Sequence, residues 1–246
     1  MITLNVILEL LDLAEEQMAL VSLRQSKRAK RLIFKASISN GFEIVLPNFY
    51  DDKWVIETIT RRKTKIEGQI TQIIESRMEL KPMSILLPPT KETWSVIYGT
   101  LKRDAPDNIV EANGRLELAD KSDDVFWGPT VLQNWLHIKA TEYLPKRLDL
   151  LSRKLGLTYN KVTIKRQKTR WGSCSIRRNI NLNRNLMLMP GDVVDYILHH
   201  ELVHLKVLNH SSKFWSELEE AFPSYKETLL RLRNFERNEL PKWALT

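Results

Sequence analysis

The chain has 246 residues, of which 43% are hydrophobic and 28% charged, and its formal net charge is +8. This balance is typical of a soluble globular protein, and the length suits one large domain or two small ones. The single cysteine, Cys174, excludes an internal disulfide and fits a reducing compartment.

The amino-terminal segment is apolar, and residues 4–16 have the spacing of a helix. Asn5, Glu9 and Asp12 interrupt it and no Lys or Arg precedes it, so it is a poor signal peptide and too interrupted to span a bilayer. We therefore expect a cytoplasmic protein without a membrane partner, in which residues 1–18 form a helical extension.

The next hundred residues are rich in strand patterns. Ser39-Asn40-Gly41 is typical of a hairpin turn between two of these strands. One long helix is expected over residues 53–77, where isoleucines line one side. The segments with a strand pattern are 19–24, 31–37, 42–46, 84–87, 93–98 and 108–111.

The second half of the chain is mostly helical in pattern. A long helix is expected over residues 130–155, and Pro145 should kink or split it. Ser224 and Glu227 fit a capping box that opens the last helix. The other expected elements are a strand pair at 162–165 and 179–186 and helices at 212–222 and about 225–239.

This order of elements predicts an α+β fold. A strand-rich region with one long helix is expected over residues 19–128, and a mostly helical region over 129–246. No linker sharp enough to separate them is present, so one continuous domain is the alternative.

Residues 192–210, DVVDYILHHELVHLKVLNH, hold four of the five histidines and contain an H-E-x-x-H pattern. A helix turns about 100° per residue, so His204 lies about 40° from His200, and Glu201 lies about 100° from it. The three side chains therefore share one face. Two imidazoles one turn apart can bind one zinc ion, and the carboxylate can reach a water on that ion.

Both ends of this helix are marked in the sequence. Asp192 is expected to be the N-cap, and Asn209 is expected to end the helix in the left-handed conformation. That reversal would bring His210 back as a third ligand, and three protein ligands plus one water are typical of catalytic zinc. His199 shares a narrow polar stripe with Asp192 and Lys206, so we expect it to face solvent and not to bind the metal.

Basic residues gather at 24–31, 61–65 and 161–184. Such clusters suit an acidic substrate or a nucleic acid. The commoner interpretation is that they are solvated faces of helices and hairpins.

The segment before the histidine helix, residues 169–175, reads TRWGSCS. Gly172 permits a tight turn, Trp171 can pack over the core, and the strand that follows at 180–183 could lie beside the zinc cleft. An exposed strand edge there would bind an extended peptide through backbone hydrogen bonds. A cysteine protease built on Cys174 is a poor alternative, because a metal already explains the histidine spacing.

Seven short motifs follow one another along the chain: SKRAKR at 26–31, RWGSCS at 170–175, INLN at 180–183, DY at 195–196, HELVH at 200–204, NHS at 209–211 and FW at 214–215. In these motifs the sequence resembles the YgjP-like metallopeptidases, relatives of the SprT and WLM groups among the zincins. The resemblance runs from about Ala19 to Phe222, and its second half is the more specific.

This resemblance implies a zincin-like second half with a β-hairpin beside the H-E-x-x-H helix. It also implies that His200, His204 and His210 bind zinc and that Glu201 is the general base. The segment before Ala19 lies outside the family pattern.

Two other zincin groups offer alternatives. Metzincins also place a third histidine six residues after the second, but they need a glycine where this chain has Val207, and a methionine turn that this chain lacks. Thermolysin-like enzymes take the third ligand from a glutamate on a later helix, so Glu217, Glu219 and Glu220 are rivals to His210.

The leading hypothesis is zinc-dependent hydrolysis of peptide bonds in a peptide or protein substrate. Zinc would acidify a water and polarise the scissile carbonyl, while Glu201 takes the proton and passes it to the leaving amine. Tyr196 and Arg170 both qualify as partners of the oxyanion. The alternative functions are a nucleic-acid-associated binding module with a structural zinc, and a zinc hydrolase of a non-peptide amide. The oligomeric state is open.

Overall fold

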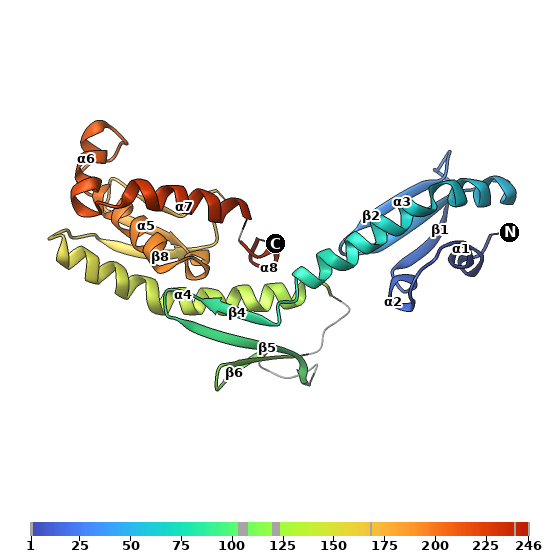
Figure 1. Ribbon diagram of the computed structural model, residues 1–246, viewed down its shortest axis with the longest axis horizontal. Coiled ribbons are helices and arrows are strands. Elements are labelled where there is room, and N and C mark those ends of the chain that lie inside the picture. Colours follow the sequence, from blue (N-terminus) through green and yellow to red (C-terminus); the bar gives the residue numbers. More distant parts are fainter. Residues whose placement is uncertain (1, 103–107, 120–123, 168, 239, 246) are drawn as a thin grey trace. The chain divides into compact units, whose positions relative to one another are not determined.

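The computed structural model describes residues 2–102, 108–119, 124–167, 169–238 and 240–245 (Figure 1). Its helices and strands are mixed along the chain, so the predicted α+β class is confirmed. The chain divides into two compact units. Unit 1 is Met1–Lys81 with Asp123–Phe126, and unit 2 is Pro82–Ser122 with Trp127–Thr246. This division does not coincide with the boundaries at residues 18 and 128 that the sequence suggested.

Unit 1 contains a three-stranded sheet covered by a long helix. Its central strand β3 (Gly41–Pro47) pairs in parallel with β1 (Val21–Ser26) and antiparallel with β2 (Ile33–Ser37). The helix α3 (Asp52–Glu79) follows, capped by the Asp51 side chain. Its isoleucines pack on the apolar side chains of β3, and this core includes Phe42, Ile44, Ile59, Ile66 and Ile70.

The amino-terminal segment of unit 1 forms two short helices, α1 (Leu4–Leu10) and α2 (Glu15–Met18), so the single helix expected over residues 4–16 is wrong. Leu11 has an extended backbone conformation that ends α1. Leu11 and Leu13 are both buried, and a helix could not turn two side chains two residues apart toward the same core.

Unit 2 begins with a four-stranded sheet in the order β4-β5-β7-β6. The sequence patterns indicated three of these strands and missed β7, although Asn113 and Gly114 at the turn before it both have the positive φ angles of a tight hairpin. Buried side chains of this sheet share one core with the helix α4, which is why these strands belong to unit 2. The strands are β4 (Ser84–Leu87), β5 (Glu92–Leu101), β6 (Ile109–Ala112) and β7 (Arg115–Ala119).

The helix α4 (Trp127–Lys154) runs through Pro145 without being split. Leu144 and Leu148, on either side of the proline, are fully buried in the core. Packing on both sides therefore holds the helix together where the proline removes a backbone hydrogen bond.

A second three-stranded sheet precedes the histidine helix. The expected strand pair is present as β8 (Lys161–Lys165) and β10 (Asn179–Asn183), which run parallel. The predicted hairpin is the antiparallel pair of β9 (Gly172–Cys174) with β10. Residues Arg184–Leu188, whose first part was expected to continue the strand, form the 3-10 helix η1.

Helices complete unit 2. These are α5 (Gly191–Val203), α6 (Ser212–Ala221), α7 (Tyr225–Asn238) and α8 (Lys242–Leu245). The short helix before Pro223 and the last long helix agree with the sequence, although its expected end at Glu239 lies outside the described residues. In the described part of the chain, no helix is long and apolar enough to cross a membrane.

Candidate metal centre

The helix α5 carries the H-E-x-x-H residues, but both of its ends differ from expectation. It begins at Gly191 with Pro190 as the N-cap, so Asp192 lies inside the first turn, where its charge still favours the helix dipole. It ends at Val203, and the next residues continue in a tighter turn. Asn209 does not have a positive φ angle; its side-chain oxygen accepts a hydrogen bond from the Ser211 amide at 3.3 Å.

Packing fixes the orientation of α5. Its apolar residues, among them Val193, Leu198 and Leu202, are fully buried in the core of unit 2. On its other side Arg147 of α4 donates to the carboxylate of Asp195 through two nitrogens, at 2.7 and 2.5 Å. A helix held by a core on one face and a bidentate ion pair on another presents its remaining face in a defined direction.

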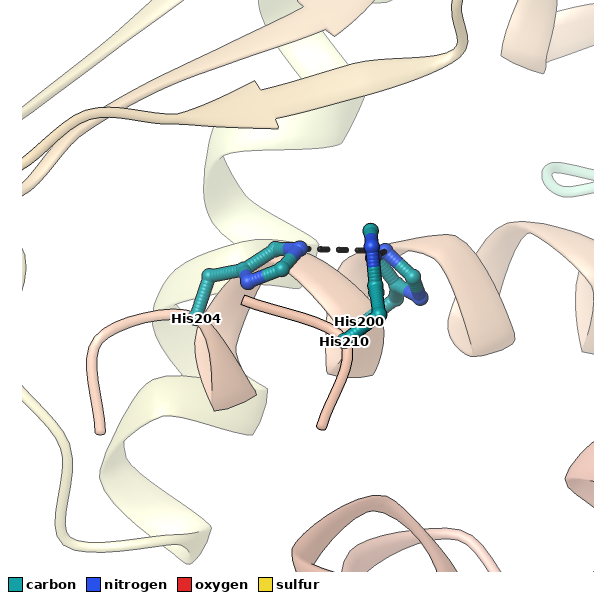
Figure 2. Close-up of side chains that lie close together, drawn as sticks. All are labelled: His200, His204 and His210. Atoms are coloured by element: carbon teal, nitrogen blue, oxygen red, sulfur yellow. Dashed lines mark hydrogen bonds between the residues drawn. The ribbon is translucent and has the colours of Figure 1, made fainter. Parts of the chain in front are cut away.

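Three histidines converge on that remaining face (Figure 2). The Nε2 atom of His200 lies 3.2 Å from Nε2 of His204 and 3.0 Å from Nε2 of His210. The candidate ligand atoms of the three side chains all lie within 4.8 Å of one another. The loop after α5 therefore returns His210 to the helix, as the sequence predicted, although not through a left-handed Asn209.

Neighbouring groups orient two of these rings. His204 Nδ1 lies 3.0 Å from the backbone oxygen of Val207, which fixes the proton on Nδ1 and leaves a lone pair on Nε2. His210 stacks on Trp215, with ring centroids 5.7 Å apart, and the Trp215 indole donates to the His210 carbonyl at 3.1 Å. The Phe214 ring packs against all three imidazoles.

The electrostatics of the cluster favour neutral imidazoles. Burial, together with the neighbouring His204 and His210, lowers the pKa of His200 to about 3. Burial also lowers the pKa of His204. Neutral imidazole is the form that binds metal ions.

The donor set fits a metal ion. Nitrogens bound tetrahedrally to zinc at about 2.0–2.1 Å would lie about 3.3 Å apart. The two closest nitrogen pairs here, at 3.2 and 3.0 Å, approach that spacing. His200, His204 and His210 are the only group of this kind found among the described residues.

Glu201 lies beside the cluster and is almost fully buried, with 4% of its surface exposed. Burial raises the pKa of its carboxyl group to about 8, against a smaller lowering by Arg170. Among the described residues, no hydrogen-bond donor reaches its Oε2 atom.

Gly172 of β9 lies directly over Glu201. A Cβ atom on Gly172 would lie 2.5 Å from Glu201 Oε1, which is closer than real Cβ contacts come. The sequence suggested that this glycine forms a tight turn, but it opens a strand, and its φ angle is not positive. Because it has no side chain, Gly172 lets the backbone of β9 approach the buried Glu201 side chain closely.

Other residues considered from the sequence lie outside the cluster. His199 does not face solvent as expected; it is buried against Phe222, and its Nδ1 lies 2.7 Å from the Asp195 carbonyl oxygen. Two of the rival glutamates pair with lysines instead. Glu217 accepts from Lys206, and Glu219 from a lysine of α7.

The two candidates for oxyanion stabilisation differ in exposure. Tyr196 is 2% exposed, its ring packs 6.1 Å from His200, and burial raises the pKa of its hydroxyl to about 12. Arg170 is exposed and precedes β9. It borders a cavity of about 360 Å³ together with Trp171, whose indole donates to Glu236 of α7.

Convergent imidazoles, a buried carboxylate and a strand edge beside them fit one class of protein, a metallopeptidase. A comparison with protein families agrees: the model of the YgjP-like, metallopeptidase domain matches residues 30–235. The chain therefore belongs to the YgjP-like metallopeptidase family, and the resemblance noted in the sequence is confirmed.

Two solved structures are similar to part of the chain. The metallopeptidase zymogen of Pyrococcus abyssi abylysin is 29% identical over 40% of this chain and 97% of that chain, with a TM-score of 0.35. The metallopeptidase zymogen of Methanocaldococcus jannaschii jannalysin is 24% identical over 37% of this chain and 94% of that chain, with a TM-score of 0.34. No curated protein compared with the chain matches it.

Proposed function

We propose that the protein is a zinc-dependent peptidase in which His200, His204 and His210 bind the zinc ion and Glu201 is the general base. The observation that carries the proposal is the convergence of three Nε2 atoms beside a buried carboxylate. Three histidine nitrogens that leave a fourth position open are the ligands of a catalytic rather than a structural zinc site.

Bound zinc would supply a Lewis acid that polarises a carbonyl and acidifies water. The chain supplies the proton transfer: Glu201 accepts a proton from the attacking water and donates it to the leaving amine. Gly172 leaves room for the carboxylate, while Phe214 and Trp215 pack against the imidazoles and hold them in place.

The substrate would bind in an extended conformation. In the order β8-β10-β9, the strand β9 is at the edge of its sheet among the described strands, and its first residue touches the base. A peptide backbone paired with this edge would bring its carbonyl groups past Glu201.

Two variants test the proposal. We expect purified protein to hold one zinc ion per chain and to cleave an unfolded protein such as reduced casein. Glu201→Gln should keep the zinc and lose cleavage by about 10²–10⁴-fold, the usual contribution of a general base. Full activity of Glu201→Gln would refute the assigned base. His210→Ala should lose the zinc, and stoichiometric metal in that variant would move the third ligand elsewhere.

The same measurements address the alternative functions. A structural zinc in a nucleic-acid module normally has four protein ligands, and only three gather among the described residues. The other alternative is a zinc hydrolase of a non-peptide amide. A protein that binds zinc and cleaves a simple non-peptide amide but no peptide would favour it. We propose a cytoplasmic location because the lone Cys174 is free.

A further inference from the structure

Two of the basic clusters in the sequence meet in one groove of unit 1. Arg31, from the first cluster, and Arg62 and Lys65, from the second, border a cavity of about 350 Å³ between β2 and α3. None of the residues that line it is acidic; the others are Leu32, Ile33, Phe34, Ile66 and Gln69.

The positive charges of this groove are not neutralised within the described part of the chain. On the same sheet, Glu43 accepts from Arg24 at 2.7 Å and from Lys35 at 3.0 Å, so those two basic residues are paired. Arg31, Arg62 and Lys65 are exposed and form no ion pair with any described residue. The groove should therefore attract a negatively charged partner.

The groove also has a free strand edge. In the order β1-β3-β2, the strand β2 is bonded to β3 on one side only, and no other described strand pairs with it. The short helices α1 and α2 contact α3 elsewhere, where Asp12 and Gln17 bond to Glu67 and Thr71. The groove is thus bordered by an unpaired backbone edge on β2 and by cationic side chains on α3.

We propose that the groove between β2 and α3 binds an extended acidic peptide segment, which adds as a strand to β2 and places carboxylates against Arg31, Arg62 and Lys65. The alternating N–H and C=O groups of a strand edge give affinity to any extended peptide, and the neighbouring cations select an acidic one.

The chemistry of the groove favours a peptide over a nucleic acid. A phosphodiester chain has no amide groups to pair with a strand edge. Single-stranded nucleic acids also need open aromatic faces on which bases stack. The aromatic ring in this groove, Phe34, is covered by the Arg62 guanidinium at 5.5 Å and packs against Phe42 at 6.1 Å.

This binding would recruit acidic segments of protein substrates, a role that depends on the proposed peptidase function. The binding itself does not depend on that function. It is best measured on the full chain carrying Glu201→Gln, so that a bound peptide is not cut.

The experiment is fluorescence anisotropy with a labelled ten-residue peptide in which glutamate alternates with valine. The test variant is Arg62→Gln with Lys65→Gln. Its matched control, Arg61→Gln with Lys63→Gln, removes two charges from the same helix at positions that do not line the groove. We expect the test variant to weaken binding by about tenfold or more and the control by less than about twofold, because only the test variant removes cations that would pair with the carboxylates of the peptide.

Two further probes separate this proposal from its rivals. The same peptide with an N-methyl group at every residue should not bind, because it has no N–H group to donate to β2. An oligothymidylate of similar charge should bind more weakly than the peptide. Equal weakening by the two double variants, undiminished binding of the methylated peptide, or tighter binding of the oligonucleotide would each overturn the proposal. Circular dichroism of both double variants checks that unit 1 stays folded.

Discussion

The two units contain three-stranded sheets of the same topology. In each sheet the third strand is central, the first runs parallel to it and the second antiparallel, giving the orders β1-β3-β2 and β8-β10-β9. In each unit a helix later in the chain contacts the second strand: α3 contacts β2, and α5 contacts β9.

The two units differ in the side chains that lie between the helix and the edge strand. In unit 2 Gly172 has no side chain, so the strand lies against Glu201 and helps to bury its carboxyl group. In unit 1 Phe34 stands between the strand and Arg62, and a groove with exposed cations is left open. The same backbone arrangement thus yields a buried reactive group in one unit and an open charged surface in the other.

Removal of the metal should have the largest effect, because it should abolish the activity of the metal centre in unit 2 and leave the groove of unit 1 unaffected. Dialysis against a strong chelator is expected to reduce peptide cleavage by about 10³-fold or more, since a catalytic metal contributes several kcal/mol to the barrier. Binding of the acidic peptide to unit 1 should not change. Cleavage assays and anisotropy on the same sample check both, and added zinc should restore cleavage. A chelated sample that cleaves at full rate would contradict the metal-dependent mechanism.

Filling the strand position above Glu201 should have the next largest effect. Gly172→Ala places a methyl group where the carboxylate lies, and a displacement of about 1 Å can cost about 10²-fold in rate. We expect kcat/KM to fall by about that factor while zinc content is unchanged.

The matched control is Gly68→Ala, on α3 of unit 1, where a Cβ would meet nothing within 4 Å. This substitution should leave cleavage unchanged and increase the free energy of unfolding by about 0.4–1 kcal/mol, because alanine restricts the unfolded chain. If both alanine variants retain activity, the contact over Glu201 has no catalytic importance.

The ion pairs of the two units should differ in strength. The Arg147 and Asp195 side chains are 30% and 22% exposed, and their contact is bidentate. Arg147→Ala should lower the free energy of unfolding by about 1–2 kcal/mol. Arg24 is 50% exposed and solvent screens its charge, so Arg24→Ala should lower the free energy of unfolding by less than Arg147→Ala does. Urea unfolding of both variants tests this order, and an equal loss would contradict it.

The smallest expected effect is the contribution of the Glu43 carboxyl group of unit 1 to stability as the pH changes. Hydrogen bonds from Arg24 and Lys35 lower the pKa of Glu43 from 4.5 to about 2. Because the folded-state pKa is the lower one, the stabilisation is present above about pH 4.5 and is lost as the pH falls toward 2. A carboxyl NMR titration should find the low value and its rise in Arg24→Ala; an unchanged value would exclude Arg24 as the cause.

The local parts of the candidate site could be predicted from the sequence. His200, Glu201 and His204 share a helix face because helical geometry relates residues one turn apart. The return of His210 could be inferred because only a short loop separates it from the helix. The hairpin turn before β3 was also recognisable, because Ser39, Asn40 and Gly41 form a typical turn sequence. In the structure Gly41 has a positive φ angle, and a Cβ there would overlap the Leu20 carbonyl.

The parts that depend on distant contacts could not be predicted. Periodicity placed His199 on a polar stripe, but Phe222, from a later segment, covers it. The contact of Gly172 with Glu201 joins a strand to a helix, and no spacing in the sequence encodes it. The groove of unit 1 likewise joins Arg31 to Arg62 only after the chain has folded.

The short helix α8 ties the carboxyl-terminal part of the chain to the interior of unit 2. Trp243 is 2% exposed, and its carbonyl accepts a hydrogen bond from Gln133 at 2.6 Å. The neighbouring Ala244 borders the same cavity as Arg170 and Trp171, which precede the strand over Glu201. Removal of α8 would leave a cavity where the Trp243 indole packs, and it should lower the free energy of unfolding by about 3–5 kcal/mol. Deletion of residues 242–245 should therefore inactivate the protein while every histidine remains in place.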